Sequence, residues 1–179
     1  MAVLLPGAGY PANGPLLHWS AALAVEQGWH VQALDWTITG QARKAPEEFV
    51  ELAVERAFAD APTATSRLVI AKSFGTYALP WAVRHGIPGI WLTPVLSEPA
   101  LSDALGRAGS THLAIGGDRD SMWLPQNVQN SAAQMFTVSG ADHSLELESG
   151  WRDSIDAQCE VLERVSRHIG HLRPRAVDN

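Results

Sequence analysis

The sequence predicts an α/β fold, with a mostly parallel sheet covered by helices. Short apolar runs alternate with segments of helical periodicity along the whole chain, and this alternation is typical of strand–helix units in parallel sheets. The length of 179 residues suits one compact domain, and a hydrophobic content of 46% is enough to fill its core. We therefore expect a single domain over residues 1–172, followed by a frayed polar tail over residues 173–179.

Six apolar runs are the expected strands. Each is short, rich in apolar or β-branched residues, and followed by glycine, proline or polar residues that favour turns. They lie at residues 3–5, 29–34, 68–71, 90–92, 113–115 and 135–138. Because helical patterns separate these runs, about six mostly parallel strands are expected.

Local residues also predict where helices begin and end. A first helix is expected to begin near Pro15, with Asn13 as its N-cap, and to end at Gly28. A second helix opens at Pro46, where two glutamates follow in the first turn. Ser97 is expected to cap a helix that follows the fourth strand.

Three further helical segments have special features. The helix after Ser73 is expected to end near residues 84–86, with a kink or an irregular first turn because Pro80 lies inside it. Pro125 is expected to start a short helix. The last helix is expected over residues 148–169, with Cys159 on its apolar stripe and therefore as a buried packing residue.

The most informative stretch is residues 68–76, in which an apolar run stops at Ser73. The small residues Ala71 and Gly75 stand two positions before and after this serine. Their spacing is close to the G-x-S-x-G pattern of a sharp strand-to-helix turn that presents a nucleophile, where bulky neighbours would collide. In isolation, the pattern also fits a strand followed by a serine-capped helix.

Three polar residues follow predicted strand ends, and the loops at the carboxyl ends of parallel strands meet at one edge of a sheet. Ser73, Asp120 and His143 are therefore expected to converge. A serine hydroxyl becomes a good nucleophile when a base takes its proton and a third group orients that base. Asp118 is an alternative to Asp120, since either could hold the histidine or cap the turn, whereas Asp142 is expected to be a turn residue.

Four segments together resemble the α/β-hydrolase superfamily, in particular its small dienelactone-hydrolase-like serine hydrolases. They are residues 4–9 (LLPGAG), 71–75 (AKSFG), 117–120 (GDRD) and 140–144 (GADHS). The resemblance implies a minimal α/β-hydrolase fold, with helices on both faces of about six strands and no lid domain. It also implies that Ser73 is the nucleophile, His143 the general base and acid, and Asp120 the acid that orients the histidine.

The same resemblance implies two backbone N–H donors for a developing oxyanion. The first belongs to Phe74, and the second to Ala8, with Gly9 as the alternative. The chain departs from the family pattern in two places. Pro6 stands where many relatives have a histidine before the glycine, and the two leading strands of larger relatives are missing.

Lys72, Tyr10 and Trp123 lie beside these segments and are candidate pocket residues. Lys72 is expected to form a salt bridge, with the attraction of an anionic substrate as the alternative. Tyr10 and Trp123 could each line a pocket or belong to the core, because tryptophans and tyrosines in a short chain serve both purposes.

Composition excludes several classes of function. The formal net charge is -6 and no Lys/Arg cluster is present, so no binding to nucleic acid or to an anionic membrane is expected. No window reaches the roughly 20 apolar residues of a membrane span, and no signal peptide is recognisable. A single cysteine excludes an internal disulfide, which fits a cytoplasmic protein. No metal motif is present and no cofactor is expected.

These observations predict a serine hydrolase that cleaves the carboxylic ester or thioester of a small-molecule acyl substrate through an acyl-enzyme intermediate. Residues 95–98 alone separate Pro94 from the next helix, so an open and shallow site is expected. One alternative is a ligand-binding protein that has the same fold without the chemistry. Oligomeric state has no signal in the sequence.

A dinucleotide-binding domain is the other alternative. Residues 7–12 fit G-x-G-x-x-A after a strand, and Asp35 ends the next strand, where a ribose-binding acid is expected. Pro11 and Pro15 count against this alternative, because they lie where a helix should begin and present its N–H groups to a pyrophosphate.

Overall fold

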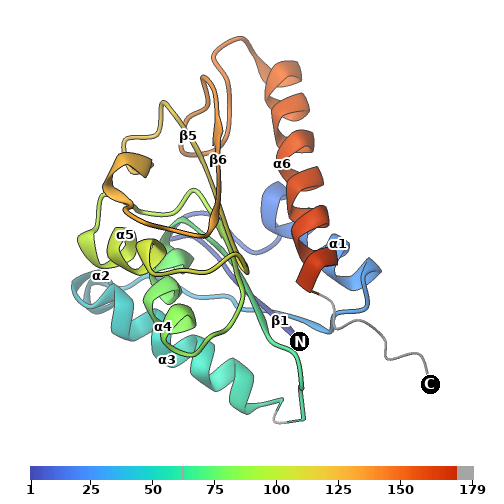
Figure 1. The fold of residues 1–179 in the computed structure, drawn as a ribbon, viewed down its shortest axis with the longest axis vertical. Helices are drawn as coiled ribbons and strands as arrows, with labels where there is room; N and C mark the ends of the chain where they lie inside the picture. Colours follow the sequence, from blue (N-terminus) through green and yellow to red (C-terminus); the bar gives the residue numbers. More distant parts are fainter. Residues whose placement is uncertain (62, 173–179) are drawn as a thin grey trace.

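The computed structural model describes residues 1–61 and 63–172, with a six-stranded sheet at the centre (Figure 1). The strand order is β2-β1-β3-β4-β5-β6, and every neighbouring pair is parallel. The strands are β1 (Ala2–Leu5), β2 (Val31–Ala33), β3 (Leu68–Lys72), β4 (Gly89–Leu92), β5 (His112–Gly117) and β6 (Gln134–Val138). The predicted α/β fold is confirmed, whereas the predicted tail at 173–179 lies outside the described residues.

Helices cover both faces of this sheet. On one face, α1 (Pro15–Glu26) and α6 (Trp151–Leu172) pack side by side (Figure 1). The other face carries α3 (Pro46–Ala59), α4 (Leu79–Arg84) and α5 (Pro99–Gly106). The shorter elements are α2 (Gly40–Lys44) and the 3₁₀ turns η1 (Ser73–Ala78) and η2 (Pro125–Asn127).

The core consists of two hydrophobic layers, one on each face of the sheet. In β3, Leu68 and Ile70 join the layer beneath α1 and α6, whereas Val69 and Ala71 join the layer beneath α3 and α4. All four residues are completely buried. A strand that is buried on both faces has a continuous apolar sequence, which is the pattern seen here.

Two predicted helix caps are wrong. The N-cap of α1 is Gly14 rather than Asn13, and the N-cap of α5 is Glu98 rather than Ser97. Both helices begin with a proline, whose fixed φ is already helical and whose missing N–H would have had no partner in the helix. A side-chain cap is therefore not needed to start either helix.

The predicted irregular turn before α4 is confirmed. The chain after β3 first forms the 3₁₀ turn η1, and Pro80 lies in the first turn of α4. The predicted glycine stops are also confirmed, since Gly28 and Gly86 have φ values of 83° and 62° just beyond α1 and α4. Such positive φ values are accessible to glycine at little cost.

Two elements near the edge of the sheet differ from prediction. β2 spans Val31–Ala33 rather than residues 29–34, and it pairs with β1 alone. The short helix α2 was not predicted, because five residues carry too little periodicity to be recognised. Its first turn is held by Thr39, whose hydroxyl oxygen accepts a hydrogen bond from the backbone N–H of Ala42.

The predicted burial of Cys159 is wrong, because this cysteine is exposed on α6. The apolar stripe that predicted it continues outward to Trp151 and Ile155, which are 67% and 50% exposed. Packing instead selects the neighbouring face, on which Ser154 is buried and its hydroxyl oxygen accepts a hydrogen bond from the N–H of Leu147. Within the described residues, every helix is too short or too polar to cross a lipid bilayer.

Candidate active site

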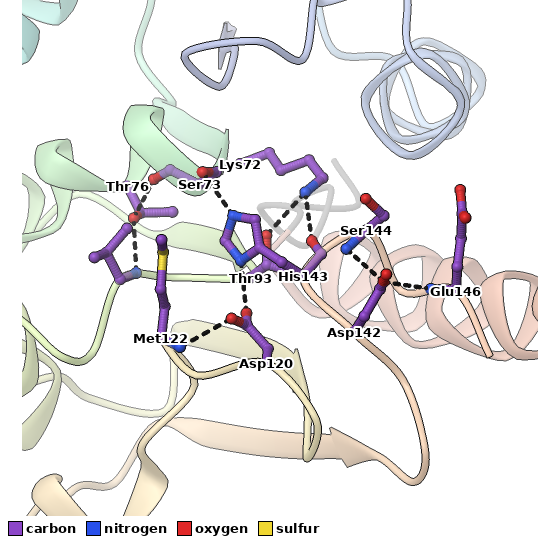
Figure 2. Close-up of polar contacts among 11 residues, drawn as sticks. Lys72, Ser73, Thr76, Thr93, Asp120, Met122, Asp142, His143, Ser144 and Glu146 are labelled. Carbon is purple, nitrogen blue, oxygen red and sulfur yellow. Dashed lines mark hydrogen bonds and ion pairs between the residues drawn. The ribbon is translucent and has the colours of Figure 1, made fainter. Parts of the chain in front are cut away.

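The parallel sheet brings three loops to one edge. Ser73 directly follows β3, Asp120 follows β5, and His143 follows β6. These strands run in the same direction, so their carboxyl ends point to the same edge of the sheet. Figure 2 shows the three side chains pointing toward one another at this edge.

Ser73 has the backbone conformation expected of a sharp strand-to-helix turn. Its φ is 50°, in the left-handed region that a non-glycine residue adopts at some energetic cost. Gly75 lies so close to β1 that an added Cβ would stand 2.5 Å from the carbonyl oxygen of Leu5. The small residue required at this position by the sequence pattern is therefore explained by contact with the neighbouring strand.

A continuous series of contacts links the three predicted residues. Ser73 Oγ lies 2.8 Å from His143 Nε2, and His143 Nδ1 lies 2.6 Å from Asp120 Oδ2. The second carboxylate oxygen, Oδ1, accepts a hydrogen bond of 2.9 Å from the N–H of Met122. The side chain of Asp120 is only 2% exposed, whereas that of His143 is 34% exposed.

The partners of the imidazole define where its protons lie. An ionised carboxylate only accepts hydrogen bonds, so Nδ1 of His143 donates to Asp120. In a neutral imidazole, Nε2 is then free to accept the hydroxyl proton of Ser73. This arrangement can move a proton from the serine oxygen to the histidine while Asp120 keeps the ring in place.

Of the two candidate acids, Asp120 is the one that contacts the histidine. Asp118 instead accepts hydrogen bonds from the N–H of Gly140, at 2.7 Å, and from the hydroxyl of Ser139. It thereby ties the turn after β5 to the turn after β6. Asp142 accepts from the N–H groups of Ser144 and Glu146, which is the turn role predicted for it.

The loop between β1 and α1 lies against Ser73. An added Cβ on Gly7 would stand 3.4 Å from Ser73 Cβ, and the N–H of Gly7 donates to the carbonyl of Tyr10. The indole N–H of Trp36 donates to the carbonyl oxygen of Gly7 across 3.4 Å. Ala8, which follows Gly7, is exposed, as is Gly9.

On the other side of the serine, Phe74 is the second residue of η1, which begins at Ser73 itself. The first N–H groups of a helical turn have no partner within that turn. Rings of Trp36, Phe49 and Tyr77 surround the Phe74 side chain, with centroids 5.5 to 6.2 Å away.

Lys72 does not form the predicted salt bridge. Its side chain is buried, with the residue 1% exposed, and no carboxylate in the described residues pairs with it. Its Nζ donates to Thr93 Oγ1 at 2.9 Å and to the carbonyl of His143 at 3.0 Å. Because it is buried, it is also not placed to attract an anionic substrate from solvent.

The two aromatic candidates have different environments. Trp123 is 3% exposed, packs over Gly116 and donates its indole N–H to Thr137 Oγ1, so it belongs to the core and does not line an open site. Tyr10 is half-buried, and its ring lies 4.6 Å from the Nζ of Lys72. Its hydroxyl oxygen accepts a hydrogen bond from the N–H of Leu16.

The fit to a dinucleotide site is poor. α1 begins at Pro15, six residues after Gly9, so no helix N-terminus follows the glycine pair directly. The N–H of Leu16 in the first turn is occupied by the Tyr10 hydroxyl. A pyrophosphate needs such N–H groups to be free. In the described residues, no group of three or more His, Cys, Asp or Glu side chains could hold a metal ion.

Three residues with contacts at this edge were missed from the sequence. Thr93 follows β4 and receives the Lys72 hydrogen bond, but nothing local predicts its positive φ of 45°. Met122 contributes its backbone N–H to Asp120, a role any residue type could fill. Trp36 could have been suspected, since it follows the second predicted strand and its indole carries a hydrogen-bond donor.

No family model and no curated protein matches the sequence. Solved structures do match in fold. Est1E from Butyrivibrio proteoclasticus, solved with bound ferulic acid, has a TM-score of 0.67 at 12% identity, over 96% of this chain and 88% of that chain. A serine hydrolase without a lid from Xanthomonas campestris has a TM-score of 0.62 at 16% identity, over 98% and 83% of the two chains.

A third similar structure is the type II thioesterase BorB from the borrelidin biosynthetic cluster. Its TM-score is 0.52 at 13% identity, and the match covers 94% of this chain and 91% of that chain. At such low identities the likeness concerns the fold. Together with the six parallel strands and the helices on both faces, it shows that residues 1–61 and 63–172 have a minimal α/β-hydrolase fold, with no lid among them.

Proposed function

We propose that this protein is a serine hydrolase that cleaves a carboxylic ester or thioester through an acyl-enzyme intermediate. The observation that carries the proposal is the series of contacts from Ser73 Oγ through the His143 imidazole to Asp120 Oδ2. A nucleophile, a base and a group that orients the base are the parts that such chemistry requires.

In the proposed first step, Ser73 Oγ attacks the carbonyl carbon of the substrate, and its proton passes to Nε2 of His143. Asp120 stabilises the imidazolium and keeps the ring oriented. The tetrahedral intermediate then loses its alkoxide or thiolate, which takes the proton from Nε2. An acyl ester on Ser73 and a free alcohol or thiol are the products.

In the second step, water replaces the leaving group. His143 takes a proton from the water as its oxygen attacks the acyl ester, and it returns that proton to Ser73 Oγ when the carboxylic acid leaves. Both steps place negative charge on the former carbonyl oxygen. We assign the N–H groups of Phe74 and Ala8 to that charge, with Gly9 as the alternative to Ala8, and each donor contributes about 3 kcal/mol.

The exposure of the site suggests which acyl groups reach it. Ser73 is half-buried, the His143 side chain is 34% exposed, and the connection between β4 and α5 is short. A substrate therefore approaches from solvent, which suits small or surface-accessible acyl groups. The similarity to Est1E and to a thioesterase is compatible with an ester and with a thioester alike.

A fluorophosphonate probe tests the proposal, because it reacts with activated serines. We expect stoichiometric labelling that maps to Ser73 and is lost in Ser73→Ala. Ser110→Ala is the matched control, because Ser110 is exposed and precedes β5, at the opposite edge of the sheet. A panel of p-nitrophenyl esters of increasing chain length, with the matching thioesters, then defines the acyl preference.

Two outcomes contradict the proposal. Wild-type protein that is folded but neither labelled nor active on any ester or thioester favours a ligand-binding protein without catalysis. Quenching of tryptophan fluorescence by NAD, in protein that the probe does not label, favours the dinucleotide alternative.

A further inference from the structure

Lys72 is a buried cation that precedes Ser73 in the sequence. The residue is 1% exposed, and within the described residues no carboxylate pairs with it. Removing an ammonium group from water is costly, and a partner of opposite charge usually offsets part of that cost. A buried lysine beside a reactive serine therefore requires a functional explanation.

The ammonium group of Lys72 joins three loops. Its Nζ donates to Thr93 Oγ1, in the loop after β4, and to the carbonyl oxygen of His143, in the loop after β6. It also lies 4.6 Å from the ring centroid of Tyr10, in the loop after β1, where a cation is attracted to the aromatic face. Figure 2 shows the amine reaching the main chain of His143, while the imidazole of the same residue reaches Ser73.

Thr93 is held in an unusual conformation at the point where it meets Lys72. Its φ is 45°, which is unfavourable for a β-branched residue, and it is completely buried. Its N–H donates to the carbonyl of Ile115 on β5 at 2.6 Å. The neighbouring strand therefore maintains the conformation in which the Thr93 hydroxyl accepts from the amine.

We propose that Lys72 is a positioning residue, whose ammonium group fixes the main chain of His143 so that the imidazole reaches Ser73 and Asp120 together. This inference rests on the proposed hydrolase function. Because Lys72 and Ser73 are adjacent, one side chain connects the backbone of the nucleophile to the backbone of the base. A small displacement of the His143 carbonyl would move both ends of the imidazole away from their partners.

The charge on Lys72 depends on pH in an accessible range. Burial lowers the pKa of Lys72 to about 8, while the carboxylates of Asp120 and Asp142 act in the opposite direction. The remaining polar groups that face the amine are Thr93, His143 and Tyr10, and burial raises the pKa of the Tyr10 hydroxyl. Above about pH 8, Lys72 becomes a neutral amine with one N–H fewer and no charge to attract the Tyr10 ring.

The alkaline limb of the pH profile follows from this titration. The value of kcat/KM should fall above about pH 8, as Lys72 loses its proton. The titration of Lys72 does not itself favour unfolding in this range. The pKa of Lys72 is lower in the folded protein than the usual value of about 10.4. Between about pH 8 and about pH 10.4, the unfolded chain therefore binds more protons at this residue than the folded protein does. The contribution of Lys72 to the free energy of unfolding increases as the pH rises through this range.

Carbon-13 labelling at Cε of lysine makes the titration directly visible by NMR. The chain has only two lysines, and the other, Lys44, is exposed on α2. We expect one resonance to titrate near pH 8 and to disappear in Lys72→Met, and the other to disappear in Lys44→Met. The alkaline fall of kcat/KM should have the same midpoint as the first resonance.

Lys72→Met, with Lys44→Met as the matched control, tests the positioning role. We expect Lys72→Met to lower kcat roughly 10- to 100-fold, as a slight misplacement of a catalytic group does, to leave KM nearly unchanged, and to remove the alkaline fall. Lys44→Met should retain the wild-type profile. The split between kcat and KM, and the loss of the alkaline limb, would not follow from a purely structural role of Lys72.

The failure of this inference differs from the failure of the proposed function. Folded protein that the fluorophosphonate probe does not label and that cleaves no ester or thioester refutes the hydrolase proposal itself. Active wild-type protein whose kcat/KM stays flat while the Lys72 resonance titrates refutes the positioning role, and this comparison holds even if Lys72→Met does not fold. A Lys72→Met variant with the kcat of Lys44→Met would refute it as well.

Discussion

Ser73 and His143 are 70 residues apart in the sequence, yet Ser73 Oγ lies 2.8 Å from His143 Nε2. β4 and β5 lie between the strands that carry them. At about 4.8 Å per strand, the ends of β3 and β6 are roughly 14 Å apart. The loop after β6 must therefore return across the sheet edge, and it begins to do so at Gly140, whose φ is 75°. Asp120, from the intervening β5, meets the imidazole on this return path.

Replacing Asp120 should be far more harmful to catalysis than replacing Asp118. Asp120→Asn leaves an amide in place of the carboxylate that accepts from His143 Nδ1, so the imidazole is no longer held in the productive tautomer. We expect kcat to fall roughly 10³- to 10⁴-fold. Asp118→Asn keeps an acceptor for the Gly140 N–H and should leave kcat close to that of wild type. Steady-state kinetics on the preferred ester compare the two, and equal losses would show that the assignment of the acid is wrong.

Gly75→Ala should destabilise the turn that presents Ser73. The added Cβ would lie 2.5 Å from the carbonyl oxygen of Leu5. Because this oxygen belongs to the main chain of β1, it cannot move aside as a flexible side chain could. We expect the free energy of unfolding to drop by at least about 2 kcal/mol in urea titrations. Gly40→Ala is the control, because nothing lies within 4 Å of its added Cβ. If both variants are as stable as wild type, β1 does not constrain the turn.

Trp36→Phe should weaken catalysis without disturbing the aromatic cluster around Phe74. The indole N–H of Trp36 holds the Gly7 carbonyl, and in a trans peptide the next N–H, that of Ala8, points the opposite way. When the Gly7 carbonyl loses this hydrogen bond, the peptide can rotate and the Ala8 N–H can point away from the oxyanion. The loss of one hydrogen bond, about 1 kcal/mol, corresponds to about fivefold in kcat. Trp19→Phe, on the exposed side of α1, is the control. Identical kcat values for the two variants would show that Trp36 does not orient the proposed oxyanion donor.

His112 should make the protein sensitive to acid. Burial, with a smaller contribution from His168, lowers the pKa of His112 to about 4, and the indole N–H of Trp91 donates to its Nδ1. Between pH 6.5 and pH 4 the unfolded chain binds a proton that the folded protein does not, so up to about 3 kcal/mol of stability is lost as the pH falls. Unfolding titrations across this range should show a shallower pH dependence for His112→Gln than for His30→Gln. Equal slopes would mean that His112 is not responsible.

The sequence predicts those features that depend on local residues. The strands, the glycine stops and the irregular turn at Pro80 follow from runs of apolar residues and from backbone preferences. The serine turn is recognisable because Gly75 must lie against β1. The convergence of three loops is predictable as well, because the carboxyl ends of parallel strands share one edge.

Other features depend on packing between distant segments. Considered from the sequence alone, Lys72 is expected to form a solvated salt bridge. In the structure, the loops that carry Thr93 and His143 meet over its side chain and bury it. Cys159 lies on a continuous apolar stripe, but packing against α1 selects the adjacent face of α6. Trp123 follows a candidate loop, yet Gly116 provides the flat surface on which its ring is buried.

Trapping the acyl-enzyme tests the central proposal most directly. The exposed thiol of Cys159 could itself react with an activated ester, so the measurement uses Cys159→Ser as its background. The protein is mixed with p-nitrophenyl acetate, quenched in acid within the burst phase and digested for peptide mass spectrometry. We expect one acetyl group on the peptide that contains Ser73, and none in the same peptide of the Ser73→Ala variant. Release of p-nitrophenol at the same rate in both proteins, with no acetyl group on Ser73, would contradict the account.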